Sequence, residues 1–374
     1  DKQVVYLPPS LVNDCLSHAP RSFLLYGRNP EKYFRLEPEQ TGFTTFGECI
    51  RIIDPQTGNA RSSTKHDLTQ ATRICDSLDI INPVQRTLDS LDKPEHSQAL
   101  HNFDALVNNT DKHICMGLGS REDAKKIIEM AAACVGGLEM LSKRPPLTAV
   151  VCPTSPLVLT KVCCEVLIES ARAGIGVCPT SCVLSGATAP ITLAGSVVVH
   201  NAEVLSCLIL AQLINKGLPS IYGGCSAIMD LRYSGAAMGS PEFALLNAAQ
   251  AQVAEYYKLP SYIGGGLTDS KLPDAQAAYE GSLSTILSTR TILISTMVPI
   301  AMAIPVNATI LASIPRPRMA MKQSKTAIGK MPATRSEAFT LISKRRTTMT
   351  VMIFCSSSAS SSVPMVSLIR SVRS

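Results

Sequence analysis

Tryptophan is absent from the 374-residue chain, and aromatic side chains make up only 5% of it. A large core must therefore be built mainly from aliphatic residues. The 45% of hydrophobic side chains against 17% charged ones indicates a globular protein rather than a disordered or fibrous one. The length allows one large domain of the barrel or doubly wound size, or two ordinary domains.

The chain also lacks a secretory signal and any Cys-x-x-Cys pair, although it has thirteen cysteines. This usage is typical of reduced thiols in a cytoplasmic protein and excludes a disulfide framework. The Cys163–Cys164 and Cys178–Cys182 pairs have no matching second pair or His, so we interpret them as buried apolar thiols rather than zinc ligands. Because the chain begins at Asp1 without Met, we expect a fragment or a processed form.

Acidic residues almost disappear near the C-terminus. Residues 288–374 hold twelve Lys and Arg but a single acid, Glu337, together with 25 Ser or Thr, eight Met and one Gly. The preceding 287 residues carry 23 basic and 28 acidic side chains, so the net charge of +6 comes from the tail. Composition and patterning together divide the chain into an N-terminal segment (1–110), a regularly patterned region (111–287) and an atypical basic tail (288–374).

Three interpretations of this tail are open. Residues 291–314 carry no charge and resemble a membrane span, although Pro299 and Pro305 weaken that interpretation. A disordered basic extension is the second interpretation. We favour the third, a slip of the reading frame near residues 284–290 that makes the tail out-of-frame translation, because the regular pattern stops there.

Upstream of the tail, short apolar strands alternate with helical patterns. Strand candidates begin near residues 113, 148, 177, 219 and 261, and each precedes a segment with helical spacing of its apolar residues. Prolines near the first helical position mark the expected helix starts, at Pro156, Pro190, Pro241 and Pro273. Before these units, residues 46–61 read as two short strands around a turn, followed by an amphipathic helix.

This order of elements predicts the fold class. Near-continuous apolar strands separated by helices are typical of a parallel sheet covered on both faces. Five such units in one direction favour an α/β fold of the TIM-type (β/α)8 barrel. A barrel needs eight units and the tail does not supply the other three, so we predict a barrel that is incomplete at its C-terminal end.

A barrel carries its function at the carboxyl ends of its strands, and polar residues gather there. Asp269 lies in the Gly-rich run "GGGLTDSK" before the expected helix, which favours a role in a site. Glu242 and Asp274 each follow a helix-starting proline, where the helix dipole alone stabilises a carboxylate by roughly 0.3–1 kcal/mol. For these two carboxylates, a structural role and a functional role are both open.

Two other features also allow two interpretations. His200, Asn201 and Glu203 interrupt an apolar helix, and they form either a core hydrogen-bond network or part of a pocket. Lys271 stands where barrel enzymes carry a Schiff-base lysine, but the nearby Asp269 would keep its amine protonated. The order of Lys and Ser in the same run excludes a phosphate loop of the Gly-Lys-Ser/Thr type.

Several long motifs occur in one order: "CPTSPLVLTKVCCEVLIESARAGI", "LSGATAPITLAGSVVVHNAEVLS", "IYGGCSAIMDLRYSGAAMGSPE" and "GGGLTDSKLPDAQAAYE". With "SFLLYGRNPE" and "LVNNTDKHI", they make the chain resemble the trimethylamine methyltransferase family of corrinoid-dependent methyltransferases. The resemblance extends from about Leu7 to about Leu287. It stops abruptly there, which supports the frame slip.

The resemblance implies a barrel enzyme that passes one methyl group from a methylated amine to the cobalt of a small corrinoid protein. It also implies that the corrinoid (cobalamin) is carried by that partner, since the chain has no Asp-x-His-x-x-Gly motif, and we expect no directly bound cofactor or metal. Archaeal trimethylamine members carry pyrrolysine at a position that we align with Leu267. Leucine cannot perform the chemistry of that residue, which makes a quaternary amine such as glycine betaine the expected substrate rather than trimethylamine.

For a cationic methylated amine, the resemblance implies a site of carboxylates and aromatic faces. The predicted catalytic residues are Asp269, Glu242 and Asp230, and the predicted substrate-binding residues are Tyr222, Tyr262, Gly265, Gly266, Leu267, Ser270, Lys271, His200 and Glu203. We expect a cytoplasmic monomer or homo-oligomer, with no nucleic acid and no membrane as partner. Two alternatives are a barrel that binds a quaternary amine without transferring methyl, and an inactive truncated family member.

Overall fold

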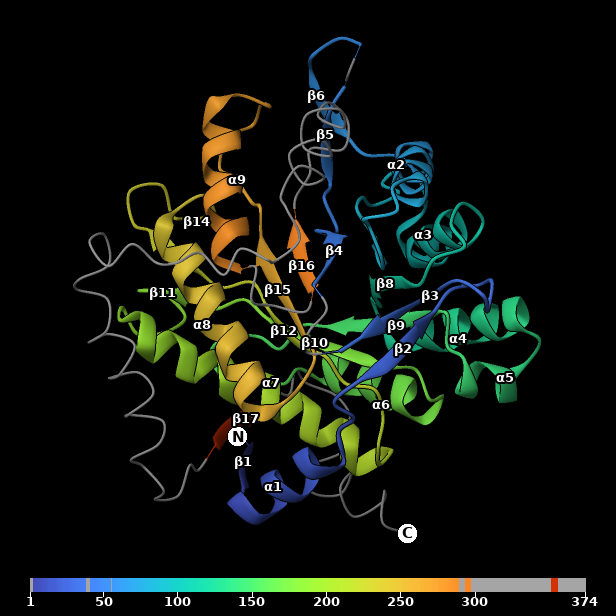
Figure 1. Cartoon of the computed structure of the whole chain (residues 1–374), viewed down its shortest axis with the longest axis vertical. Coiled ribbons are helices and arrows are strands. Elements are labelled where there is room, and N and C mark those ends of the chain that lie inside the picture. Colours follow the sequence, from blue (N-terminus) through green and yellow to red (C-terminus); the bar gives the residue numbers. More distant parts are fainter. Residues whose placement is uncertain (1–2, 38–40, 55, 289–292, 297–350, 356–374) are drawn as a thin grey trace, which may run out of the picture.

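The computed structural model describes residues 3–37, 41–54, 56–288, 293–296 and 351–355. A parallel sheet of eight strands lies at its centre (Figure 1). In sheet order the strands are β4 (Gly42–Thr45), β16 (Leu293–Thr296), β15 (Ser261–Gly265), β12 (Tyr222–Gly224), β10 (Val177–Ser181), β9 (Leu147–Val151), β8 (Ile114–Gly117) and β7 (Val84–Gln85).

The two strands at the ends of this order, β4 and β7, also lie side by side. A parallel bridge joins Phe43 to Ile81, and the Asn82 amide donates a hydrogen bond to the Phe43 carbonyl at 2.9 Å. Beyond the strand ends, the Glu48 amide donates to the Arg86 carbonyl at 3.0 Å. The eight strands therefore form a ring, which confirms the predicted TIM-type α/β fold.

A helix follows each barrel strand from β4 to β15, and Figure 1 shows these helices around the outside of the sheet. They are α2 (Lys65–Ser77), α3 (Gln98–Val107), α4 (Arg121–Val135), α6 (Lys161–Arg172), α7 (Leu193–Ile214), α8 (Pro241–Tyr257) and α9 (Ala275–Ser288), with the short α5 (Leu138–Lys143) after α4. Within the described ranges no helix follows β16, which is consistent with the predicted incompleteness at the C-terminal end, but β16 itself corrects the expectation that the tail supplies no barrel strand. The first two units of the barrel come from the segment before residue 110.

Most barrel helices begin at a hydroxyl cap rather than at a proline. In five of them a Ser or Thr side chain accepts a hydrogen bond from the amide three residues later, which satisfies a free amide of the first turn. The caps are Thr64, Ser120, Thr160, Thr192 and Ser240. Of the prolines expected to start helices, Pro241 does so, whereas Pro156, Pro190 and Pro273 lie in the loops before the helices.

A hairpin of β2 (Phe23–Tyr26) and β3 (Tyr33–Leu36) covers the amino end of the barrel. Leu25 and Leu36 from this hairpin form one buried cluster with Cys178, Ile221 and Tyr262, which lie at or near the starts of their strands. Access to the barrel interior is therefore to be sought at the opposite, carboxyl end.

Smaller sheets of two or three strands lie outside the barrel sheet. The predicted hairpin within residues 46–61 is formed by β5 (Arg51–Ile53) and β6 (Ala60–Ser62). The loops after β10 and β12 contribute a small sheet of β11 (Leu184–Ser185), β13 (Ala227–Asp230) and β14 (Gly235–Ala237). The chain starts with β1 (Gln3–Leu7), which pairs with β17 (Val351–Cys355), and α1 (Pro9–His18).

One described helix, α7, is long and apolar enough to cross a membrane by composition alone. Its most apolar window is 78% buried within the protein, where it packs between α6 and α8 and against β10. These contacts identify α7 as a core helix of the barrel wall. The uncharged run at 291–314 and the rest of the basic tail lie outside the described residues, apart from β16 and β17.

Candidate functional site

The carboxyl ends of the barrel strands lie together at one end of the ring, which we call the mouth. The residues at these strand ends are Glu48 after β4, Arg86 after β7, Gly117 of β8, Cys152 after β9, Cys182 after β10 and Cys225 after β12. The negative charge of Glu48 contributes to raising the pKa of Cys152. Because β7 and β8 separate the strands of these two residues in the ring, their interaction runs across the mouth.

Glu48 and Arg86 form a polar group on one side of the mouth. Glu48 Oε2 lies 2.5 Å from Arg86 Nη2, and Glu48 Oε1 accepts a hydrogen bond from the Gly117 amide at 2.7 Å. The Arg86 side chain is 8% exposed, whereas that of Glu48 is 35% exposed. Arg86 Nε also lies 3.7 Å from Asp89 Oδ1, so one guanidinium is shared between two carboxylates.

Thiols continue the lining on the next strands. Cys152 and Cys182 are exposed, whereas Cys225 is buried, and the Cys225 amide donates to the Ser181 carbonyl at 3.1 Å. A hydrogen bond with Cys225, followed by burial, raises the pKa of Cys182 well above its usual range. The surrounding protein is the main cause of the raised pKa of Cys152, because it removes much of the water around the thiol even though the residue keeps an exposed surface. Both are therefore neutral and weakly nucleophilic thiols at neutral pH.

Glu203 of α7 supports the mouth from behind. Its carboxylate accepts hydrogen bonds from the Ser155 hydroxyl and the Leu157 amide, both at 2.8 Å, and from the Ser181 hydroxyl. It thereby connects the loop after β9 to the end of β10. Burial raises the pKa of Glu203, and the three hydrogen bonds oppose that rise.

The wall of the mouth near β15 is apolar. Leu267 is 1% exposed and forms a cluster with Cys225, Ala227 and Phe243, against which the partly buried Phe46 packs. This cluster brings the ends of β12 and β15 together with the segment after β4. The leucine that the resemblance aligns with pyrrolysine is therefore buried in this cluster.

Asp269 connects two loops through backbone amides. Its carboxylate accepts hydrogen bonds from Met238 at 3.1 Å and from Gly239 at 2.9 Å. Its own amide donates to Glu280 Oε2 at 2.9 Å, and the Thr268 hydroxyl donates to the same oxygen at 2.7 Å. Burial raises the pKa of Glu280, but the hydrogen bonds outweigh it and lower the pKa overall. The carboxylate of Asp269 thus holds the loops after β14 and β15 in place.

The other predicted residues of this loop have local partners. Gly265 ends β15 and is buried, and Gly266, with φ of 68°, donates its amide to the Ser284 hydroxyl at 2.9 Å. The Ser270 hydroxyl contacts the Leu272 carbonyl at 3.1 Å. Lys271 is exposed, and its amine donates to the Asp269 carbonyl at 2.9 Å.

Tyr222 and His200 lie behind the sheet rather than in the mouth. The Tyr222 hydroxyl is 3.2 Å from His200 Nδ1 and 3.0 Å from Asn201 Oδ1, and His200 Nε2 donates to the Gly223 carbonyl at 3.0 Å. Burial lowers the pKa of His200 to about 3, so the ring is neutral. The structure therefore separates the polar residues of α7, with His200 and Asn201 in a core network and Glu203 beside the strand ends.

The remaining predicted residues lie apart from one another. Tyr262 belongs to the cluster that covers the amino end of the barrel, and its hydroxyl donates to the Thr45 carbonyl at 3.4 Å. Asp230 ends β13 and accepts the Arg232 amide at 2.8 Å. Glu242 is partly exposed in the first turn of α8. In the described ranges, no hydrogen bond or ion pair joins Asp230 or Glu242 to the mouth.

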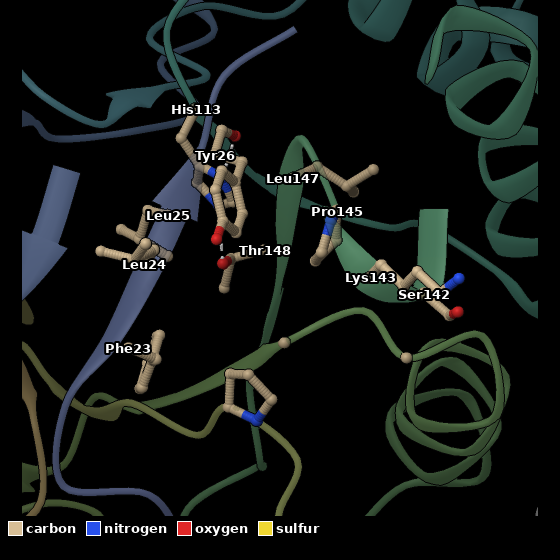
Figure 2. A pocket seen from close by; sticks show the side chains of 13 residues that line it. Phe23, Leu24, Leu25, Tyr26, His113, Ser142, Lys143, Pro145, Leu147 and Thr148 are labelled. Atoms are coloured by element: carbon tan, nitrogen blue, oxygen red, sulfur yellow. Dashed lines mark hydrogen bonds between the residues drawn. The ribbon is translucent and has the colours of Figure 1, made fainter. Parts of the chain in front are cut away.

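A cavity of about 210 Å³ lies at the amino end of the barrel, beneath β2 (Figure 2). His113 projects into this region, where its Nδ1 donates to the Tyr26 carbonyl and its Nε2 accepts from the Thr148 hydroxyl, both at 2.8 Å. Burial lowers the pKa of His113 to about 4. The cavity is on the opposite side from the strand ends that carry function in barrels, so the mouth is the better candidate site.

Sequence reasoning missed Glu48, Arg86, Cys152 and Cys182. The strands before Glu48 and Arg86 have four and two residues, too short for a recognisable apolar period. The prediction of buried thiols holds for Cys163 and Cys178 and is wrong for Cys182, because the last follows a strand end. The part of the chain that the structure describes has no group of three or more His, Cys, Asp or Glu suited to a metal ion.

Comparisons with known proteins identify the family. Residues 1–294 match the profile of the family described as trimethylamine methyltransferase. Trimethylamine methyltransferase MttB of Desulfitobacterium hafniense (strain DSM 10664 / DCB-2) is 43% identical over 286 residues, which cover 76% of this chain and 58% of that protein. Glycine betaine methyltransferase of Desulfitobacterium hafniense (strain Y51) is 34% identical over 285 residues, covering 76% and 59%.

A solved structure has the same fold. The Methanosarcina barkeri monomethylamine methyltransferase (MtmB) superposes with a TM-score of 0.52 at 11% identity, covering 78% of this chain and 61% of that chain. The present chain thus spans about six-tenths of the length of the proteins that it matches. From the profile match and the 43% identity, we conclude that the chain belongs to the trimethylamine methyltransferase family.

Proposed function

We propose that the protein transfers a methyl group from a methylated amine to the cobalt of a corrinoid held by a small partner protein. The observation that carries this proposal is the family membership, which coincides with a mouth of suitable chemistry at the functional end of the barrel. A partly exposed carboxylate, Glu48, stands at the mouth, and Phe46, two residues before it, packs against the apolar cluster that contains Leu267. This combination suits a cation whose surface is made of methyl groups.

The chemistry needs orientation more than proton transfer. The N–CH3 bond breaks as the methyl carbon bonds to cobalt in an in-line displacement, and a quaternary amine leaves as a neutral tertiary amine. The protein then has to hold the methyl carbon between the nitrogen and the cobalt. Because Cys152 and Cys182 are neutral thiols, they do not compete with cobalt for the methyl group.

The proposed substrate is a quaternary amine such as glycine betaine. Leu267 stands in the apolar wall of the mouth. Its side chain offers neither an amine nor an electrophilic group that could react with a substrate. The relatives carry both substrate names, since one is named for trimethylamine and another for glycine betaine. The choice between these substrates therefore rests on Leu267.

The corrinoid enters this proposal as the methyl acceptor, carried by the partner protein. Its approach would be to the carboxyl end of the barrel, where Cys152 and Cys182 are exposed. A cytoplasmic location, and a monomeric or homo-oligomeric state, remain predictions.

Two alternative functions differ from methyl transfer in what the protein would bind and what it would catalyse. A barrel that binds quaternary amines without transferring methyl would share the mouth but not the reaction. An inactive truncated member would neither bind the amine nor transfer methyl, since the chain spans only part of its relatives.

One experiment separates the three. The purified protein is mixed with a family corrinoid protein reduced to cob(I)alamin, and with either glycine betaine or trimethylamine, while the absorbance of methyl-cobalt is followed. We expect methyl-cobalt with betaine and less with trimethylamine. Amine binding without methyl-cobalt would favour the binding protein, and neither binding nor methyl-cobalt would favour the inactive member.

A further inference from the structure

We propose that Glu48 is the residue that receives the trimethylammonium head of the substrate and so determines the selectivity of the site for cations. This inference rests on the proposed function, and it names a carboxylate outside the set that the sequence predicts. Of those predicted carboxylates, Asp269 bonds to backbone amides, and Asp230 pairs with Arg232 at a hairpin end.

The charge balance around Glu48 favours a cationic ligand. Among the described residues, Arg86 is the one guanidinium that lies within 4 Å of both Glu48 and Asp89. Two carboxylates and one guanidinium leave one net negative charge beside the barrel interior. Glu48 is the more accessible carboxylate of the two, at 35% exposed against 20% for Asp89, so a ligand in the mouth meets Glu48 first. A cationic head would neutralise the remaining charge at short range.

The backbone holds Glu48 in an unusual position. Its φ of 74° is in the left-handed region that residues with a side chain rarely adopt, and such residues cluster at functional sites. Space for the carboxylate depends on Gly117, because an added Cβ there would lie 2.7 Å from Glu48 Oε1. An ion pair needed only to join β4 to β7 would not require this strained backbone together with a glycine on β8.

Two polar groups without partners among the described residues lie on the neighbouring strand end. Val84 packs in the main core outside the ring, so strand alternation turns the neighbouring Gln85 to the interior. Gln85 Oε1 and Thr87 Oγ1 are buried and make no hydrogen bond among the described residues. Buried polar atoms are usually paired, so two unpaired ones on the same strand end indicate a place for a ligand or water.

An aromatic ring completes the arrangement. Phe46 lies two residues before Glu48, and it packs against the cluster that contains Leu267 and Phe243. Trimethylammonium groups are commonly held by a carboxylate together with an aromatic face. The segment Phe46-Gly47-Glu48 would supply both from one strand end.

The test compares a charged ligand with its neutral isostere, without any corrinoid partner. Choline and 3,3-dimethylbutan-1-ol differ only by the exchange of the quaternary nitrogen for carbon. Calorimetric titration of the 374-residue chain and of the E48Q, E48D and E139Q variants gives both affinities for each protein. Glu139 is the matched control because its side chain is 85% exposed and pairs with Lys143 on α5, away from the mouth.

We expect the original protein and E139Q to prefer choline, and E48Q to lose that preference by roughly ten- to hundredfold while its affinity for the alcohol is unchanged. E48D keeps the charge and should retain more of the preference than E48Q. An equal fall in both affinities in E48Q would indicate a structural role and overturn the proposal, as would an original protein without preference for choline. If E48Q does not fold in a thermal melt, the E48D preference decides, and its loss overturns the proposal.

The result of the choline titration can be distinguished from the result of the methyl-cobalt assay. Selective choline binding through Glu48 without methyl-cobalt formation would refute methyl transfer and leave the role of Glu48 intact. Methyl transfer with no effect of E48Q on cation preference would refute the role of Glu48 alone.

Discussion

Replacing Glu203 with alanine is expected to lower the free energy of unfolding by about 2–4 kcal/mol. The substitution removes the acceptor of the Leu157 amide and of the Ser155 and Ser181 hydroxyls. A buried donor without a partner costs about 1–3 kcal/mol, and the emptied volume adds to that. Leu157, with φ of 58°, would also lose the contact that holds its backbone.

The isosteric Glu203→Gln variant separates shape from charge. Glutamine keeps the volume and an acceptor for the Leu157 amide, so we expect a change within about 1 kcal/mol at neutral pH. Because burial raises the pKa of Glu203 above 4.5, the native state binds the proton more tightly than the unfolded state. The contribution of the group to stability is thus full below pH 4.5 and declines as pH rises through the native pKa.

Urea unfolding followed by far-ultraviolet circular dichroism measures the free energy of unfolding of these variants, since the chain has no tryptophan for fluorescence. The stability of the original protein relative to Glu203→Gln should fall between pH 4.5 and pH 7. The exposed Glu139→Ala serves as the control, with an expected change below about 0.5 kcal/mol. A Glu203→Ala variant as stable as this control, or a pH dependence of opposite sign, would refute the reasoning.

Three other predictions concern the mouth and its loops. Gly117→Ala places a Cβ 2.7 Å from Glu48 Oε1, so calorimetry should find the affinity for choline reduced about tenfold or more. The control is Gly235→Ala, whose Cβ meets nothing within 4 Å and which should bind choline normally. The Cβ of Gly239→Ala would overlap the Glu280 carboxylate, so urea unfolding should show a free energy of unfolding about 1–3 kcal/mol lower than that of the Gly235→Ala control. Equal stabilities of the two variants would contradict the Asp269–Glu280 connection. Cys152 and Cys182 should react slowly with iodoacetamide at pH 7 and faster as pH rises, in peptide mass mapping; fast, pH-independent labelling would count against their raised pKa values.

The sequence was sufficient for the barrel but not for all of its strands. The five barrel strands between residues 110 and 287 have apolar runs long enough to stand out, and each leads into a helix. By contrast β7 has two residues and β4 four, and their places in the sheet depend on partners distant in the chain. Glu48 and Arg86 could not be recognised as strand-end residues before their strands were known.

The direction of side chains was the second feature that could not be predicted from the sequence. The run "IYGGCS" predicts a buried strand, but a strand that is apolar on both faces does not reveal which residues face the interior. The structure turns Tyr222 toward His200 and Asn201 on α7, whereas Cys225 lines the mouth. Asp269 was correctly found in a turn at a strand end, yet its bonds to Met238 and Gly239 depend on a loop that sequence alone does not bring near.

The position of β16 between β15 and β4 has a consequence for biosynthesis. Leu293 to Thr296 pair with Gly42 to Thr45, so the ring is joined by residues about 250 positions apart. While the ribosome synthesises everything in between, β4 has an open edge that is available to other chains. Closure of the ring awaits the emergence of the last barrel strand, and the nascent protein is exposed to mispairing for the time that these residues take to be synthesised.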